Sequence, residues 1–207
     1  MRAIVFTKEP VPGRVKTRLA SALSPQGAAM LHVAMTRDVL DTARLAGLEV
    51  HVALDGAAGW FDAPHSAQVD GDLGDRMLAA MQDGPVLALG SDAPTVPLDL
   101  LRMAGEALGD HEVVLGPAFD GGVWTIGWRK PHPRLFEGVA WSTPTVFGDL
   151  SQRAEQLGLS LCWLPFWYDI DTPSSLNFLR QHLRTLSSDT AHWTRQCLSS
   201  LTASPTT

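Results

Sequence analysis

The chain has 207 residues, the usual size of one domain, and its hydrophobic content of 45% is enough to form a sizeable core. This composition excludes a wholly disordered protein, and the formal net charge of −6 argues against a general nucleic-acid binder. Five of the sixteen Lys and Arg residues nevertheless lie within the first 18 positions, where Glu9 alone opposes them. A basic segment in an acidic protein indicates a small anionic ligand.

Short apolar runs alternate with helical patterns along the chain, which predicts an α/β fold with a mostly parallel sheet. The predicted strands cover residues 3–7, 49–54, 85–90, 112–116, 123–128 and 160–164. The predicted helices cover residues 25–46, 72–82, 97–108 and about 191–201, and two more begin at Thr143-Pro144 and Thr172-Pro173. We expect residues 1–184 to form one domain, followed by a Ser- and Thr-rich extension, 185–207, that is partly helical or frayed.

A basic loop follows the first predicted strand. Lys8, Arg14, Lys16 and Arg18 lie in a segment that contains prolines and Gly13 and leads into a helix. Such a loop presents backbone N–H groups and cationic side chains to a polyphosphate, although it lacks the GxxxxGK[ST] spacing of a Walker loop. A solvated basic turn is the alternative. Open α/β sheets bind ligands where strands end, and this favours phosphate binding.

Acidic residues cluster with one arginine in the segment DGDLGDRM. Asp72 as the N-cap of a helix, with Asp75 at its third position, accounts for most of this pattern. For Arg76, a place on that helix and a contact with a phosphate are equally good interpretations.

Asp92 follows a buried hydrophobic strand that ends at Gly90-Ser91. A carboxylate at the carboxyl end of a central strand faces the same crevice as the basic loop. Mg²⁺ is a hard cation, commonly held by one or two carboxylates together with the phosphates that it neutralises. Asp92 is therefore the best single metal candidate. The alternative is an Asp that closes the following turn through its own backbone.

The segment Asp120-Gly121-Gly122 predicts a tight turn, in which glycine supplies a positive φ or lets a ligand approach the backbone. Three tryptophans nearby, Trp124, Trp128 and Trp141, could wall a pocket. Tryptophan is more often a core residue, so these side chains rank below the carboxylates as site candidates.

Asp169 and Asp171 alternate along an extended segment, so both carboxylates point the same way. Either one could supply a second carboxylate to a metal shared with Asp92. The alternative is an Asp that helps to cap the helix beginning at Thr172-Pro173. We prefer the capping interpretation for Asp169 but not for Asp171.

The remaining sequence features exclude several kinds of site and segment. Cys162 and Cys197 form neither a disulfide framework nor a metal-binding CxxC pair, and the seven His residues lack metal-ligand spacing. No GxSxG elbow or partnered nucleophilic Cys indicates covalent catalysis. The apolar run at residues 3–6 is too short for a signal peptide, and no apolar stretch reaches membrane-spanning length. We expect a cytoplasmic protein that binds neither membranes nor nucleic acid.

The chain resembles a bacterial family in six ordered segments, KEPVPGRVKTRLA, GDLGDRM, GSDAPTVP, DGGVWTIG, WSTPTVF and DIDTP. This family is described as GT-A-like, rSAM/selenodomain-associated transferases of the nucleotide-diphospho-sugar transferase superfamily. The resemblance covers about residues 2–184 and implies a three-layer α/β/α, Rossmann-like GT-A fold. More distant relatives are similar to 2-phospho-lactate guanylyltransferase, molybdenum-cofactor guanylyltransferase and the sugar-acid cytidylyltransferases.

The resemblance implies that the basic loop holds nucleotide phosphates, that two aspartates bind Mg²⁺ or Mn²⁺, and that the Asp-Gly-Gly turn lies at the acceptor. Together with the motifs it gives as catalytic candidates Lys16, Asp92 and Asp120. Candidates for nucleotide or phosphate binding are Lys8, Gly13, Arg14, Lys16, Arg18 and Arg76. Candidates for binding the acceptor are Asp120, Gly121, Gly122, Trp141, Ser142 and Thr143. The candidate metal ligands are Asp92 and Asp171.

The chain departs from these relatives at two points. Ser174-Ser175 replaces the acidic residue that often follows D-x-D-T-P in the nucleotidyl branch, and the LAGG start of the molybdenum-cofactor branch is absent. The favoured function is Mg²⁺-dependent nucleotidyl transfer from an NTP to a small phosphorylated or acidic acceptor. The alternatives are a glycosyltransferase that uses a nucleotide sugar, with Asp120 as acceptor base, and a nucleotide-binding module without turnover.

Overall fold

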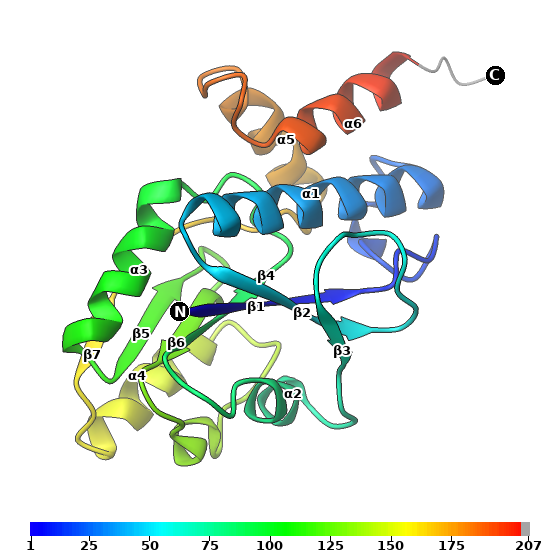
Figure 1. The fold of residues 1–207 in the computed structure, drawn as a ribbon. Coiled ribbons are helices and arrows are strands. Elements are labelled where there is room, and N and C mark those ends of the chain that lie inside the picture. Colours follow the sequence, from blue (N-terminus) through cyan, green and yellow to red (C-terminus); the bar gives the residue numbers. More distant parts are fainter. Residues whose placement is uncertain (204–207) are drawn as a thin grey trace.

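A seven-stranded sheet with helices on both faces forms the centre of the computed structural model, which describes residues 1–203 (Figure 1). The strands are ordered β3-β2-β1-β4-β6-β5-β7. β6 runs antiparallel to β4 and β5, and the other neighbouring strands are parallel to each other. The predicted α/β fold with a mostly parallel sheet is therefore confirmed.

The strands match the predicted ones to within one residue at each end, except that β3 was not predicted. They are β1 (Arg2–Lys8), β2 (Glu49–Asp55), β3 (His65–Ala67), β4 (Val86–Gly90), β5 (Val113–Pro117), β6 (Val123–Trp128) and β7 (Leu161–Trp163). β3 has only three residues, all exposed, so it has no apolar pattern by which it could be recognised.

The helices are α1 (Pro25–Leu45), α2 (Leu73–Ala80), α3 (Leu98–Asp110), α4 (Val146–Gln156), α5 (Pro173–His182) and α6 (His192–Ala203). Two 3-10 turns, η1 (Thr17–Leu19) and η2 (Pro133–Phe136), were not predicted. The predicted capping residues are confirmed at the start of α1, α2 and α5. Ser24 accepts a bond from Gly27 N, and Asp72 and Thr172 each form a capping box with the residue three positions later.

The predicted start of α4 at Thr143-Pro144 is wrong, because the helix begins at Val146. The preceding residues form a separate polar turn. Ser142 adopts a left-handed φ of 63°, and Thr143 Oγ1 donates a hydrogen bond to the carbonyl of Ala140 at 2.6 Å. This turn satisfies the hydroxyl and delays the helix by two residues.

Buried side chains form three clusters. The first lies between the sheet and helices α1 and α3, and the second between the sheet and α2, η2 and α4. The third contains residues of α1, α5 and α6, and Figure 1 shows α5 and α6 beyond α1 on the side away from the sheet. α1 therefore packs on both sides, with Leu40 in the first cluster and Leu31 in the third.

The predicted helix at about residues 191–201 corresponds to α6, which packs against α1. The predicted fraying of the chain end concerns in part residues 204–207, which lie outside the described residues. Within residues 1–203, no helix combines the length and the apolar character that a membrane crossing requires.

Candidate active site

The strand order reverses beside β1. β2 and β3 lie on one side of β1 and β4 lies on the other, so the carboxyl ends of β1 and β4 flank a topological switch point. Ligands of open α/β sheets bind in the crevice at such a point. A cavity of about 830 Å³ opens there, a volume within the range of small-molecule sites.

Most of the predicted site residues line this cavity. They are Lys8, Arg14, Lys16, Arg18, Arg76, Asp92, Asp120, Gly122, Trp141, Ser142, Thr143 and Asp171. Gly13 and Gly121 are not among the lining residues, and both have a left-handed φ. A side chain at Gly121 would collide with the carbonyl of Pro144, so this glycine allows the β5–β6 turn to pack against the loop before α4.

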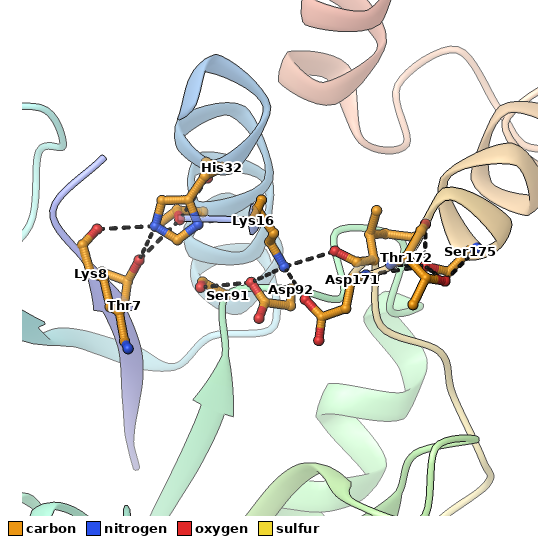
Figure 2. Close-up of polar contacts among 11 residues, drawn as sticks. Thr7, Lys8, Lys16, His32, Ser91, Asp92, Asp171, Thr172 and Ser175 are labelled. Carbon is orange, nitrogen blue, oxygen red and sulfur yellow. Dashed lines mark hydrogen bonds and ion pairs between the residues drawn. The ribbon is translucent and has the colours of Figure 1, made fainter. Parts of the chain in front are cut away.

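The ammonium of Lys16 lies between two of the predicted carboxylates. Nζ donates hydrogen bonds to Asp171 Oδ1 at 2.7 Å and to the carbonyl of Ile170 at 2.8 Å, and it lies 2.8 Å from Asp92 Oδ1 (Figure 2). Only 4% of the Lys16 side chain is exposed. Burial lowers the pKa of Lys16, but the charges of Asp92 and Asp171 outweigh it and raise the pKa above its ordinary value. Lys16 is therefore a buried ammonium at neutral pH.

The backbone brings these groups together from distant parts of the chain. Lys16 adopts a left-handed φ of 50° just before η1, an uncommon conformation for a residue with a side chain. The amide of Ile170 donates to the carbonyl of Asp92 at 2.9 Å, which joins the segment before α5 to the end of β4. Asp92 and Asp171 consequently face the same ammonium although the sequence separates them widely.

Two further carboxylates, Asp120 and Asp169, line the same cavity. Burial, followed by the charges of Asp92, Asp120 and Asp171, raises the pKa of Asp169 to about 7. Burial also acts to raise the pKa of Asp92, but the charge and hydrogen bond of Lys16, with smaller effects of His32 and Ser91, together lower it. Negative charge therefore exceeds positive charge on this side of the cavity.

Asp169 does not cap α5, so the preferred interpretation of this residue was wrong. Thr172 Oγ1 accepts the bond from Ser175 N, and Ser175 Oγ accepts the bond from Thr172 N. These two side chains complete the capping box, and the Asp169 side chain lines the cavity instead.

Three cations on the cavity wall have exposed side chains and, within residues 1–203, form no ion pair: Lys8, Arg14 and Arg18. Arg76 differs from them, because its guanidinium lies 3.2 Å from Asp55 Oδ2 and donates to Gln68 Oε1 at 3.0 Å. The basic loop therefore leaves three charges available to an anion. Arg76 is held by its own partners instead.

Of the three tryptophans considered, Trp141 lines the cavity. Trp124 and Trp128 are 2% and 0% exposed and belong to the core clusters on the two faces of the sheet. Each donates its indole N–H to a backbone carbonyl, that of Pro165 for Trp124 and that of Met81 for Trp128. These two side chains are core residues.

His32 is a cavity residue that sequence analysis missed. It lies on α1 with 4% exposure, and its Nε2 is 3.0 Å from the carbonyl of Lys8 and 3.1 Å from Thr7 Oγ1 (Figure 2). A carbonyl only accepts, so Nε2 carries the proton, and the buried Nδ1 has no partner among the described residues. A signal was present in the sequence, because His32 shares the apolar face of α1 with Ala28 and Met35.

The donors at this site suit a hard divalent cation. Asp92 and Asp171 offer carboxylate oxygens that converge on one point, and the local excess of negative charge favours a cation. Residues 1–203 contain no group of three or more His, Cys, Asp and Glu residues that could hold a metal without other ligands. The residues present therefore fit Mg²⁺ or Mn²⁺ if phosphate oxygens supply further ligands.

Comparison with known proteins shows the family to which the chain belongs. Residues 19–143 match the family described as "Uncharacterized protein conserved in bacteria (DUF2064)". The chain belongs to the DUF2064 family. No curated protein matches it.

A solved structure from Desulfovibrio desulfuricans G20, provisionally named a nucleotide-diphospho-sugar transferase, is 30% identical to the DUF2064 protein. The match covers 98% of this chain and 98% of that structure's chain, and its TM-score is 0.86. A nucleotidyl transferase from Methanothermobacter has 19% identity, covers 90% of this chain and 99% of its own, and gives a TM-score of 0.58. The 2-C-methyl-D-erythritol 4-phosphate cytidylyltransferase of Thermus thermophilus has 16% identity, coverage of 89% and 100%, and a TM-score of 0.54. The likeness at 30% identity supports the superfamily resemblance seen in the sequence, and the other two show that the fold is shared.

Proposed function

We propose that the DUF2064 protein transfers a group from a nucleotide donor to a small-molecule acceptor with the help of Mg²⁺ or Mn²⁺. The form that we favour is nucleotidyl transfer from an NTP to a phosphorylated or acidic acceptor. One observation carries this proposal: the cavity at the switch point is lined both by three cations that form no ion pair within residues 1–203 and by a cluster of carboxylates. Polyphosphate and metal are the two ligands that such a pair of surfaces would bind together.

The basic loop provides the binding site for the donor phosphates. Lys8, Arg14 and Arg18 have no protein counter-ion among the described residues, so their charges are free to offset those of a triphosphate. His32 holds the start of this loop through the carbonyl of Lys8. Arg76 also lines the cavity, but Asp55 already offsets part of its charge.

Asp92 and Asp171 are the proposed metal ligands, and a bound divalent cation would neutralise charge on the donor phosphates. The acceptor would lie near Asp120, Gly122 and Trp141, on the wall formed by the β5–β6 turn and the loop before α4. The carboxylate of Asp120 already accepts a bond from Gly122 N at 2.9 Å, which orients it in the turn.

In the favoured reaction an anionic oxygen of the acceptor forms a bond to the α-phosphorus of the NTP. The bond from that phosphorus to the α–β bridging oxygen breaks, and its electron pair leaves with pyrophosphate. A phosphate or carboxylate acceptor is already ionised at neutral pH, so no protein base is needed. The protein contributes position and charge, and no covalent nucleophile is required.

Glycosyl transfer from a nucleotide sugar is the second candidate, because the relative with 30% identity is provisionally named a nucleotide-diphospho-sugar transferase. The same cations would then bind the diphosphate leaving group. Asp120 would accept the proton of the attacking hydroxyl.

Phosphorus NMR distinguishes these reactions. The protein is incubated with Mg²⁺, each NTP or nucleotide sugar, and a mixture of small phosphorylated and carboxylic acceptors. Release of pyrophosphate identifies nucleotidyl transfer, and release of a nucleoside diphosphate identifies glycosyl transfer. GTP and CTP are the first donors to test, because the sequence resembles guanylyl- and cytidylyltransferases. Binding of these donors without any product would instead support a nucleotide-binding module.

A further inference from the structure

The position of Lys16 has a consequence for the order in which ligands enter the cavity. Its ammonium can donate three hydrogen bonds, and three oxygens surround it: Asp92 Oδ1, Asp171 Oδ1 and the carbonyl of Ile170. The side chain is 4% exposed. Lys16 therefore has no free donor for a phosphate in this conformation.

The two carboxylates that fit a divalent cation are the same two that hold Lys16. A metal ion between Asp92 and Asp171 and an ammonium at the same place would repel each other strongly at such short range. A metal ion that arrives alone must therefore displace a cation that already has good partners. The protein carries its own positive charge where the metal would bind.

We infer that Lys16 is an internal counter-ion that keeps Asp92 and Asp171 closed to a divalent cation until a polyphosphate draws the ammonium away. This inference rests on the proposed function, because it assigns the trigger to the donor phosphates. Lys16 then exchanges between two sets of partners, the carboxylates in the free protein and the phosphates in the complex.

The surroundings of Lys16 allow this exchange. The residue lies in the basic loop, and its long stem carries a compact charge that can be redirected by rotation. Lys8, Arg14 and Arg18 make the rest of the loop attractive to the same anion. A polyphosphate bound there offers Nζ new oxygens inside the cavity that Lys16 already lines.

The exchange of partners couples phosphate binding to metal binding, and the direction of this coupling can be measured. If phosphate binding removes Lys16 from the carboxylates, it raises the affinity for metal, and metal binding must raise the affinity for phosphate by the same factor. Free Mg²⁺ or Mn²⁺ without phosphate binds weakly. Removal of the Lys16 charge should therefore strengthen the binding of metal alone, whereas removal of an ordinary phosphate-binding lysine should not.

The test compares Mn²⁺ binding to the wild-type protein, Lys16→Met and Lys8→Met by calorimetry, in the absence of any phosphate. Lys8 is the matched control, because it lines the same cavity without contacting either carboxylate. We expect Lys16→Met to bind Mn²⁺ about tenfold more tightly than the wild type, a typical size for coupling between sites. Lys8→Met should bind Mn²⁺ like the wild type, and both variants should bind inorganic tripolyphosphate more weakly.

Equal or weaker Mn²⁺ binding by a folded Lys16→Met overturns the inference and leaves the proposed nucleotide transfer in place. If none of the three proteins binds Mn²⁺ even when tripolyphosphate is present, the inference is wrong, and so is the assignment of Asp92 and Asp171 as metal ligands in the proposed function.

A measurement on the wild-type protein covers the case in which Lys16→Met does not fold. The sequence has three lysines, Lys8, Lys16 and Lys130, so a ¹⁵N-lysine sample gives a simple ammonium spectrum. In the free protein Lys16 should be the one ammonium protected from exchange with water, because the side chains of Lys8 and Lys130 are exposed. Mg²⁺ with tripolyphosphate should shift this signal, and an unchanged Lys16 signal at saturation contradicts the inference.

Discussion

Asp92 is the residue on which the proposed chemistry depends most. It follows β4 at the switch point and forms an ion pair with Lys16. Asp92→Asn keeps the size of the side chain but removes its charge, so we expect Mg²⁺-dependent nucleotide binding to weaken at least about tenfold, as the loss of a partly buried charged ligand implies. Calorimetry with and without Mg²⁺ measures this effect.

Asp99→Asn is the control for that substitution, because Asp99 is an exposed residue of α3 outside the cavity. Circular dichroism shows whether both variants are folded. A folded Asp92→Asn protein that keeps its nucleotide affinity and its dependence on Mg²⁺ removes Asp92 from the metal site.

His32 gives the protein a predictable response to acid. Burial is the main cause that lowers its pKa, Lys16 and Lys8 lower it further, and Asp92 opposes them. The neutral form is favoured in the folded state, so the stability that this group contributes is present above the ordinary pKa of 6.5 and is lost as the pH falls. This group lowers the free energy of unfolding by at most about 1.4 kcal/mol for each pH unit, because the unfolded state binds at most one more proton at His32 than the folded state does.

His32→Gln separates this titration from the hydrogen bond. The Gln amide can still donate to the carbonyl of Lys8, but it does not titrate. We expect the free energy of unfolding, measured with urea, to fall less steeply below pH 6.5 for His32→Gln than for the wild type. Parallel pH profiles for the two proteins exclude His32 as the buried titrating group.

Among single residues, the sequence predicted the charged side chains of the site better than it predicted His32. Lys16, Asp92 and Asp171 were recognisable because they follow strands or precede a helix in loops. The contact between His32 and the carbonyl of Lys8 joins a helix to the end of a strand, and no local pattern reports it. The contact of Lys16 with both carboxylates also required the three-dimensional fold.

Among the elements, α6 is joined to α1 by a buried carboxylate in addition to apolar packing. Asp38 of α1 is 4% exposed and accepts hydrogen bonds from the amides of Trp193 and Thr194 at 2.9 and 2.8 Å. These are orphan donors in the first turn of α6, so Asp38 caps a helix that lies far away in the sequence. The outer face of α1 depends on this contact, because α6 covers it.

Asp38→Ala tests this contact. The substitution leaves two amides without partners in a buried place, and we expect the free energy of unfolding to fall by about 2 kcal/mol. Asp41→Ala is the control, since its half-exposed carboxylate accepts a bond from Trp193 Nε1 and pairs with the exposed Arg44, and the loss of both should cost about 0.5 kcal/mol. Urea unfolding measures both changes. Equal effects of the two substitutions contradict a special role for Asp38.

The elements themselves were predictable where capping residues or apolar runs mark them. Ser24, Asp72 and Thr172 each start a helix in the way that their hydrogen bonds require. The start of α4 was not predictable, because the same Ser and Thr residues that favour a helix start also form the turn at residues 140–145. β3 was not predicted, because its three exposed residues show no periodic apolar pattern.

For the whole molecule, the fold class followed from the alternation of elements, but the strand order did not. The alternation does not reveal that β4 pairs with β1, or that β6 runs antiparallel between β4 and β5. The site depends on that order, because the pairing of β4 with β1 brings Asp92 beside the basic loop. Residues 19–143 match the family, whereas the catalytic proposal also needs Lys16 and Asp171, which lie outside that range.

The most direct test of the central claim is a thermal-shift comparison of NTPs and nucleotide sugars, each with and without Mg²⁺. A ligand that binds only the folded state raises the melting temperature by mass action. At a hundredfold excess over Kd we expect a rise on the order of 5–10 °C for a domain of this size. The account predicts such a rise for at least one NTP, dependent on Mg²⁺ and absent in Asp92→Asn. No shift with any NTP or nucleotide sugar, or a shift that Mg²⁺ and Asp92→Asn leave unchanged, contradicts a metal-assisted nucleotide site in this cavity.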